Sequence, residues 1–146
     1  MSDYLFLYGT LLPNQAPSEV SALIRKLRKV GEGRVPGRLY DLGDYPGAIL
    51  DARSETNVTG EVFALPDGQS ILPDLDSYED FDPADRRTSL FVRERHPVML
   101  SDGRRLECWV YVYNRNLGEA PLVVGGDYSK VTTRSTKPLE RLKGTK

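Results

Sequence analysis

The sequence predicts an α+β domain in which a small mixed sheet is curled or closed into a barrel, with flanking helices. Three observations predict this fold. Short strand-like runs recur between residues 4 and 114, glycine and proline residues interrupt them, and stretches with helical spacing separate them. Bends at glycines allow a sheet to close on itself. The length of 146 residues suits one domain, which we place at residues 1–128, followed by a basic tail at residues 129–146.

The first elements are a buried strand and a helix. Residues 4–8 form a continuous apolar and aromatic run, which is typical of a strand that is buried on both faces. Ser18 can cap a helix whose apolar residues recur at helical spacing. The basic residues within the segment 25–29 would lie in the last turns of this helix, where they favour the helix dipole, and Gly31 would end it.

Short strands with glycine and proline breaks follow the predicted helix. Residues 34–40 form a strand that contains Pro36-Gly37, and this pair predicts a bulge or bend. Tyr45-Pro46-Gly47 predicts a turn before residues 48–50. Residues 58–65 form a further strand. These breaks are the bends that a curled sheet requires.

A short helix carries the first candidate catalytic group. Glu79 lies four residues after Leu75 and seven after Leu72, so the three side chains share one helical stripe. Burial of a lone carboxyl group raises its pKa, and such a group can act as both acid and base near neutral pH. The alternative is a carboxylate at the helix end that faces solvent. The same spacing predicts that Asp76 and Asp80 point outward.

A hairpin closes the predicted sheet. Residues 89–100 and 105–114 are strand-like, and Asp102-Gly103 lies between them, which is a strong hairpin signal. In the second strand Trp109, Tyr111 and Tyr113 alternate with smaller apolar residues, so the three aromatic side chains share one face.

Composition narrows the functional classes. Twenty basic and 21 acidic residues give a net charge of −1, which argues against a nucleic-acid-binding domain, although residues 128–146 hold six basic residues and one acidic residue. One cysteine, Cys108, excludes an internal disulfide and indicates a reducing compartment, so we expect a cytoplasmic protein. Cys108 lies within a strand-like run and is expected to be a small buried residue.

The sequence predicts neither a metal site nor a membrane span. With His96 as the one histidine, no metal-ligand spacing is present. No stretch is long and apolar enough to predict a membrane span.

Taken in order, the motifs of this chain resemble those of the gamma-glutamylcyclotransferase-like superfamily, in particular its AIG2-like branch. The first is Tyr8-Gly9-Thr10-Leu11, and the central one is Leu75-Asp76-Ser77-Tyr78-Glu79. The other segments that match are 35–41, 45–47, 59–63, 91–93 and 109–113. Together they span roughly residues 4–128.

The resemblance implies a small β-barrel-like fold and an enzyme that releases 5-oxoproline and a free amine from a γ-glutamyl amide. It implies that Glu79 acts as general acid and base, and that Tyr8, Gly9, Thr10 and Leu11 hold the glutamyl end. Tyr111 would help to line the pocket. Loop amides and the Thr10 hydroxyl would bind either the α-carboxylate or the developing oxyanion. The resemblance implies a small-molecule substrate, and neither a metal nor an organic cofactor.

Two departures from the family pattern leave the substrate open. Asp80 stands where relatives often have glycine, and Phe91 stands where a tyrosine is common. Arg93 is expected to face water or to pair with an acidic neighbour such as Glu61.

Two further classes of function remain as alternatives to the enzyme. They are a catalytically inactive domain that binds a small metabolite, and an interaction domain that uses the basic tail. The oligomeric state is not predicted.

Overall fold

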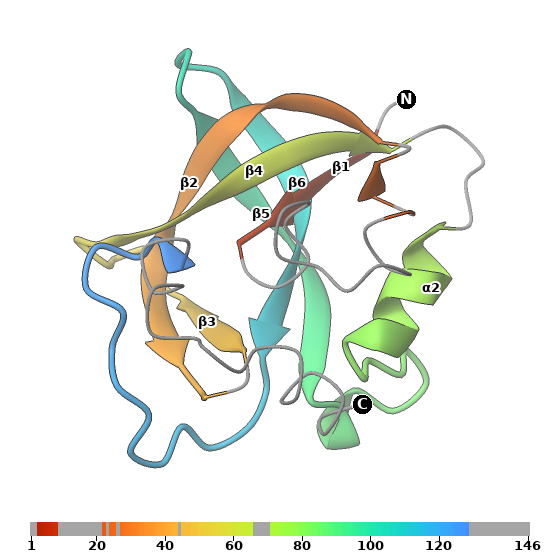
Figure 1. Ribbon diagram of the computed structural model, residues 1–146, viewed down its shortest axis with the longest axis vertical. Coiled ribbons are helices and arrows are strands. Elements are labelled where there is room, and N and C mark those ends of the chain that lie inside the picture. Colours follow the sequence, from red (N-terminus) through yellow and green to blue (C-terminus); the bar gives the residue numbers. More distant parts are fainter. Residues whose placement is uncertain are drawn as a thin grey trace.

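The computed structural model describes residues 3–8, 22, 24–25, 27–43, 45–65 and 71–128. The predicted positions Gly9, Thr10 and Leu11 lie outside the described residues, as do most of the predicted helix that begins at Ser18 and the basic tail 129–146. In the described part the elements are one α-helix, one short 3₁₀ helix and six strands (Figure 1). The strands are β1 (Asp3–Leu7), β2 (Arg28–Asp41), β3 (Pro46–Leu50), β4 (Asn57–Leu65), β5 (Phe91–Leu100) and β6 (Arg105–Tyr113), and the helices are α2 (Ile71–Tyr78) and η1 (Arg86–Thr88).

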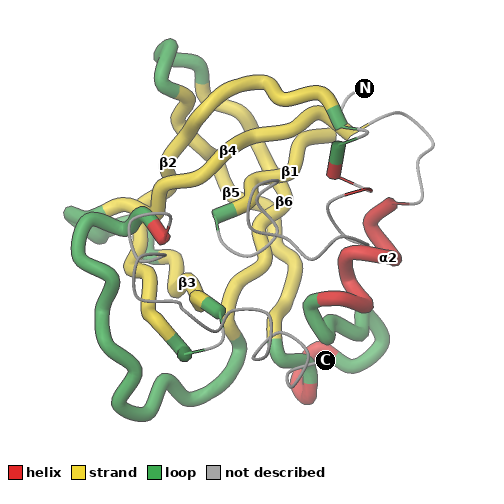
Figure 2. The backbone as a smooth tube through the Cα atoms, viewed as in Figure 1, coloured by secondary structure: helices red, strands yellow, loops and turns green. Residues whose placement is uncertain are grey.

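Five of the strands close into a barrel. The neighbours around it are β2, β4, β1, β6 and β5, and the pairing of β2 with β5 at Gly33 and Arg34 completes the circuit. The pair β1–β6 is parallel and the other pairs are antiparallel, so the barrel is mixed, as predicted. Figures 1 and 2 show β2 and β4 curving strongly across it.

The long strand β2 changes partner at the predicted break. It pairs with β4 up to Pro36 and with β3 from Gly37 onward. A Cβ atom at residue 37 would lie 2.5 Å from the carbonyl oxygen of Ile49, so the close approach of β3 requires glycine. The strand is nevertheless continuous there, and its register shift lies between Lys29 and Gly31.

The predicted end of the first helix is wrong. Strand β2 begins at Arg28, so the predicted helical turn at Arg28 and Lys29 is extended chain, and Gly31 lies inside the strand. The cause is pairing with β4, in which Arg28 lies opposite Ala64 and Lys29 opposite Phe63. Backbone hydrogen bonds to a neighbouring strand outweigh a local helix preference that is worth only tenths of a kcal/mol per residue.

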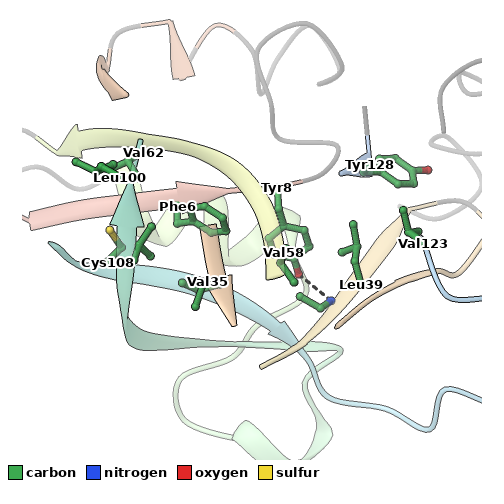
Figure 3. Close-up of a cluster of buried hydrophobic side chains, with 13 residues drawn as sticks. Phe6, Tyr8, Val35, Leu39, Val58, Val62, Leu100, Cys108, Val123 and Tyr128 are labelled. Carbon is green, nitrogen blue, oxygen red and sulfur yellow. Dashed lines mark hydrogen bonds between the residues drawn. The ribbon is translucent and has the colours of Figure 1, made fainter. Parts of the chain in front are cut away.

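Two groups of buried side chains lie on opposite faces of the barrel wall. The inner core is formed by Phe6, Tyr8, Val35, Leu39, Ala48, Val58, Val62, Val98, Leu100, Cys108, Val110, Val123 and Tyr128, and Figure 3 shows its members. The outer core is formed by Leu5, Leu7, Ile24, Leu27, Phe63, Leu65, Ile71, Leu75, Phe81, Phe91, Val92 and Tyr111. Alternate residues of β1 contribute to each, which explains why the sequence is apolar and aromatic from Tyr4 to Leu7.

The helix α2 covers part of the barrel wall. Its residues Ile71 and Leu75 are buried in the outer core, against side chains of β1 and β4. The aromatic face predicted for β6 lies on this side too, because Trp109 and Tyr113 pack against the outer core and Tyr111 belongs to it. The outer core therefore brings α2 and β6 together, and the candidate site lies where they meet.

Candidate functional site

Glu79 lies in a tight turn that ends α2. Its amide donates to the carbonyl of Leu75 at 2.9 Å, and the amide of Phe81 donates to the carbonyl of Asp76 at 2.8 Å. Asp80 adopts a left-handed conformation with φ of 58°. These features define a Schellman motif, which usually places glycine at the left-handed residue. Aspartate tolerates that conformation better than most side chains, so the turn forms with Asp80 in the place of a glycine.

The side chain of Asp76 is buried beneath this turn. Its carboxylate accepts two hydrogen bonds from Arg93, at 2.7 Å from Nε and 2.9 Å from a terminal guanidinium nitrogen, and a third from the Tyr111 hydroxyl at 2.7 Å. Asp76 is 5% exposed. The prediction that it points outward is therefore wrong, because a buried carboxylate is retained where donors satisfy its oxygens.

Arg93 is held between Asp76 and aromatic rings. Its guanidinium carbon lies 4.4 Å from the ring centroid of Trp109 and 5.7 Å from that of Phe81. Burial by itself would lower the pKa of Arg93, but the hydrogen bonds and charge of Asp76 outweigh it and raise the pKa. The expectation that Arg93 pairs with an acidic residue is therefore confirmed, but the partner is Asp76. The named candidate Glu61 binds Lys29 at 3.2 Å.

Two buried phenols link the strands next to the turn. The Tyr8 hydroxyl donates to the main-chain oxygen of Tyr111 on β6 and accepts a hydrogen bond from the Ala48 amide on β3 at 3.3 Å. Figure 3 shows the second bond as a dashed line among the inner-core side chains. The hydrogen bond from Tyr111 to Asp76 then joins β6 to α2. These contacts connect β3, β1, β6, α2 and, through Arg93, β5.

Glu79 acts electrostatically on both phenols. The pKa of Tyr8 is raised, first by burial and second by the negative charge of Glu79. The pKa of Tyr111 is raised by burial, then by the hydrogen bond and charge of Asp76 and by the charge of Glu79. Both hydroxyls therefore keep their protons at neutral pH. The structure thus brings the predicted site residues Tyr8, Glu79 and Tyr111 together.

Sequence reasoning missed Asp76 and Arg93. The sequence contained one signal for Asp76. This residue lies four positions after Leu72, so its side chain falls on the same inward-facing side of the helix as Leu72. Its partner Arg93 is 17 positions away, and only the packing of α2 on β5 and β6 brings the two together.

Other candidate chemistry is not supported in the described part of the chain. No group of three or more histidine, cysteine, aspartate or glutamate side chains there is placed to hold a metal ion. Burial, followed by the charge of Glu107, raises the pKa of Cys108 to about 12, so its thiol is not ionised at neutral pH. This result confirms the prediction of a small buried residue. None of the described helices is long and apolar enough to cross a membrane.

The sequence matches a known family over most of its length. The family model described as gamma-glutamyl cyclotransferase, AIG2-like, matches residues 5–130. A search of curated proteins found no match.

Solved structures share the fold. YkqA from Bacillus subtilis matches with a TM-score of 0.67 and 19% identity over 92% of this chain and 42% of that chain, so this chain spans less than half of that relative. An AIG2-like protein from mouse matches with a TM-score of 0.66 and 22% identity, over 86% of this chain and 88% of the mouse chain. A gamma-glutamyl cyclotransferase matches with a TM-score of 0.58 and 17% identity, over 99% of this chain and 86% of that chain.

Proposed function

We propose, from the premise that this chain belongs to the gamma-glutamyl cyclotransferase, AIG2-like family, that it releases 5-oxoproline and a free amine from a γ-glutamyl amide. The observation that carries the proposal is the position of Glu79. It lies in a turn fixed by main-chain hydrogen bonds, where its charge acts on two buried phenols.

The reaction needs a positioned substrate and one acid/base group. The α-amine of the glutamyl group attacks its own γ-carbonyl carbon, so that a ring C–N bond forms while the bond to the leaving amine breaks. Holding amine and carbonyl together supplies much of the acceleration, because an intramolecular attack avoids the entropy cost of bringing two molecules together. Glu79 takes the proton from the attacking nitrogen and gives one to the departing nitrogen. Protons balance, and the substrate itself supplies the nucleophile.

The remaining site residues would bind the glutamyl end. We propose that the segment Tyr8-Gly9-Thr10-Leu11 holds it and that Tyr111 forms part of the pocket wall. Support comes from Tyr8, which directly follows β1 and is anchored by its hydroxyl to β3 and β6. This anchor fixes the position of the first residue of the segment.

The identity of the leaving amine is open, and a panel of substrates tests both the reaction and its specificity. We would measure 5-oxoproline release from γ-glutamyl amino acids, γ-glutamyl-ε-lysine and γ-glutamyl amines. The wild-type protein would be compared with Glu79→Gln and with Glu119→Gln, a matched change at an exposed loop position.

We expect turnover by the wild type and by Glu119→Gln, and a loss of about 10²–10⁴-fold in Glu79→Gln with the fold intact. Equal activity of a folded Glu79→Gln would overturn the assignment of Glu79. Absence of turnover on every substrate by folded wild-type protein would favour the second candidate, a domain of the same fold that binds a small metabolite without catalysis.

A further inference from the structure

Three aromatic side chains that have no role in the proposed reaction meet at one place in the fold. Tyr45 lies just before β3, Phe91 begins β5 and Tyr113 ends β6. The ring centroids of Tyr45 and Phe91 are 5.8 Å apart, and those of Phe91 and Tyr113 are 5.4 Å apart. Both separations are typical of interacting aromatic rings. The three side chains therefore form one aromatic cluster.

The ring of Tyr113 is seated against the main chain of β3. A Cβ atom at Gly47 would lie 2.9 Å from Cγ of Tyr113 and 3.0 Å from its Cβ, so any other residue there would force this ring to move. Phe91 lies directly opposite Tyr113 in the pairing of β5 with β6. Figure 1 shows β3 beside the end of β6. The position of the aromatic cluster is thus set by three strands.

The aromatic cluster lies beside the turn that carries Glu79. Leu90 connects the two, because its amide donates to the carbonyl of Asp80 at 3.0 Å and its carbonyl accepts the amide of Asn114 at 2.9 Å. Leu90 directly precedes β5, and Asn114 directly follows β6. The two strand ends that carry Phe91 and Tyr113 are therefore tied to the turn through one residue.

The aromatic cluster offers an apolar surface to a ligand. Phe91 is 3% exposed and carries no hydroxyl group, whereas Tyr45 and Tyr113 are only partly buried, so part of each of their rings is accessible. Tyr113 also lies on the same face of β6 as the site residue Tyr111. Aromatic rings bind alkyl and aryl groups by removing apolar area from water. The surface beside Glu79 can therefore select an apolar group.

The leaving amine is the part of the substrate that suits this surface. The glutamyl end carries an ammonium and a carboxylate group, and both lose hydration without compensation against apolar rings. The chain attached to the departing nitrogen carries no obligatory charge. Since the γ-carbonyl carbon must lie near Glu79 for proton transfer, that chain starts next to the aromatic cluster.

We propose that the aromatic cluster receives the leaving amine, and that the preferred substrates are γ-glutamyl derivatives of amines with an apolar alkyl or arylalkyl chain. The inference rests on the proposed function and names the class of its leaving group. Tyr45 and Tyr113 contact the chain of the departing amine, and the buried ring of Phe91 holds them in place.

A series of γ-glutamyl amides with leaving amines of increasing length tests the inference. We would measure kcat/KM for the derivatives of methylamine, propylamine and pentylamine. The derivative of ethanolamine is added, because it replaces the terminal methyl group of propylamine by a hydroxyl group. The proteins would be the wild type, Tyr45→Ala, Tyr113→Leu and, as control, Tyr4→Leu, which changes a partly buried ring that packs against the inner core. Thermal unfolding shows whether each variant is folded.

We expect kcat/KM of the wild type to rise with each added methylene group, by up to about fourfold, and to be higher for propylamine than for ethanolamine. Tyr45→Ala and Tyr113→Leu should lower kcat/KM for the pentylamine derivative about fivefold more than for the methylamine derivative. Tyr4→Leu should keep the wild-type dependence on chain length. Tyr113→Leu keeps its position apolar and decides the test if Tyr45→Ala does not fold.

Three results would overturn the inference. The first is a wild-type kcat/KM that does not depend on chain length. The second is an unchanged dependence in the folded variants of the aromatic cluster, since an equal loss for all substrates indicates a general structural defect. The third is the same loss of dependence in Tyr4→Leu.

Failure of this inference is distinguishable from failure of the proposed function. Turnover that does not depend on chain length would keep the reaction and overturn the inference alone. If the wild type turns over no γ-glutamyl amide, the reaction fails, and calorimetry then measures binding of the same series. Affinity that rises with chain length in the wild type but not in Tyr113→Leu would still support the aromatic cluster as the surface that binds the apolar chain. Affinity independent of chain length, or no binding, would overturn both.

Discussion

The inner and outer cores are built from the same strands but differ in their polar groups. In the inner core the Tyr8 hydroxyl and the Cys108 thiol are both bonded to main-chain oxygens. Against the outer core lies a charged group, in which Asp76, Arg93 and Tyr111 bind one another. The comparison teaches that the polar groups of the barrel interior are neutral and bonded to the main chain, whereas the charged groups of the site that we propose lie where α2 packs on the wall.

The largest expected effect on stability comes from breaking the ion pair of the outer side. Arg93→Met would leave the Asp76 carboxylate buried without its charged partner, and we expect a loss of about 4 kcal/mol in the free energy of unfolding. Chemical denaturation measures it. The double variant Asp76→Leu/Arg93→Met should recover most of this stability but not 5-oxoproline release. Recovery of activity as well would show that the ion pair serves stability alone.

A truncation in the inner core should affect stability without a specific effect on catalysis. Leu100→Ala removes a side chain that is 2% exposed, and we expect a loss of about 3 kcal/mol. Activity per folded molecule should stay near the wild-type value. Val124→Ala, at a side chain that is 88% exposed, serves as control and should change stability by less than about 0.5 kcal/mol. A specific loss of activity in Leu100→Ala would contradict the division between the two cores.

Alkaline pH provides a smaller test of the inner core. The unfolded Cys108 thiol ionises near its ordinary pKa of 9.0, but burial keeps it protonated up to about 12 in the folded protein. The contribution of this thiol to the free energy of unfolding is therefore fully present below pH 9, and it is lost as pH rises toward 12. We expect Cys108→Ala to lose less stability than the wild type between neutral pH and about pH 10. Rapid reaction of Cys108 with a thiol reagent at neutral pH would contradict its burial.

The smallest expected effect concerns the turn beside Glu79. Asp80→Gly relieves the left-handed conformation of a residue that carries a Cβ atom, so we expect thermal stability to rise, by about 0.5–1 kcal/mol. Thermal unfolding measures this change. A decrease would show that contacts of the Asp80 side chain outweigh the backbone strain.

The barrel could largely be predicted because its signals are local. β1 reads as buried on both faces, and Asp102-Gly103 marks the hairpin of β5 and β6, which the structure confirms. The start of β2 could not be predicted. The residues around Arg28 predict a helix. Arg28 lies in a strand because it pairs with a residue more than 30 positions away.

The candidate site was predictable only in part, for the same reason. Glu79 and Tyr111 belong to motifs that can be read along the chain. The burial of Asp76 depends on donors from β5 and β6, and a carboxylate in a helix without a visible partner is expected to face solvent. The prediction for Asp76 failed because a local sequence pattern does not show partners that lie far away along the chain.

The most direct test of the central claim is the stoichiometry of products from a γ-glutamyl amide. The account predicts that the wild-type protein releases 5-oxoproline and free amine in equal amounts, and that folded Glu79→Gln releases neither at a comparable rate. Release of free glutamate in place of 5-oxoproline, or an unchanged rate in Glu79→Gln, would contradict it.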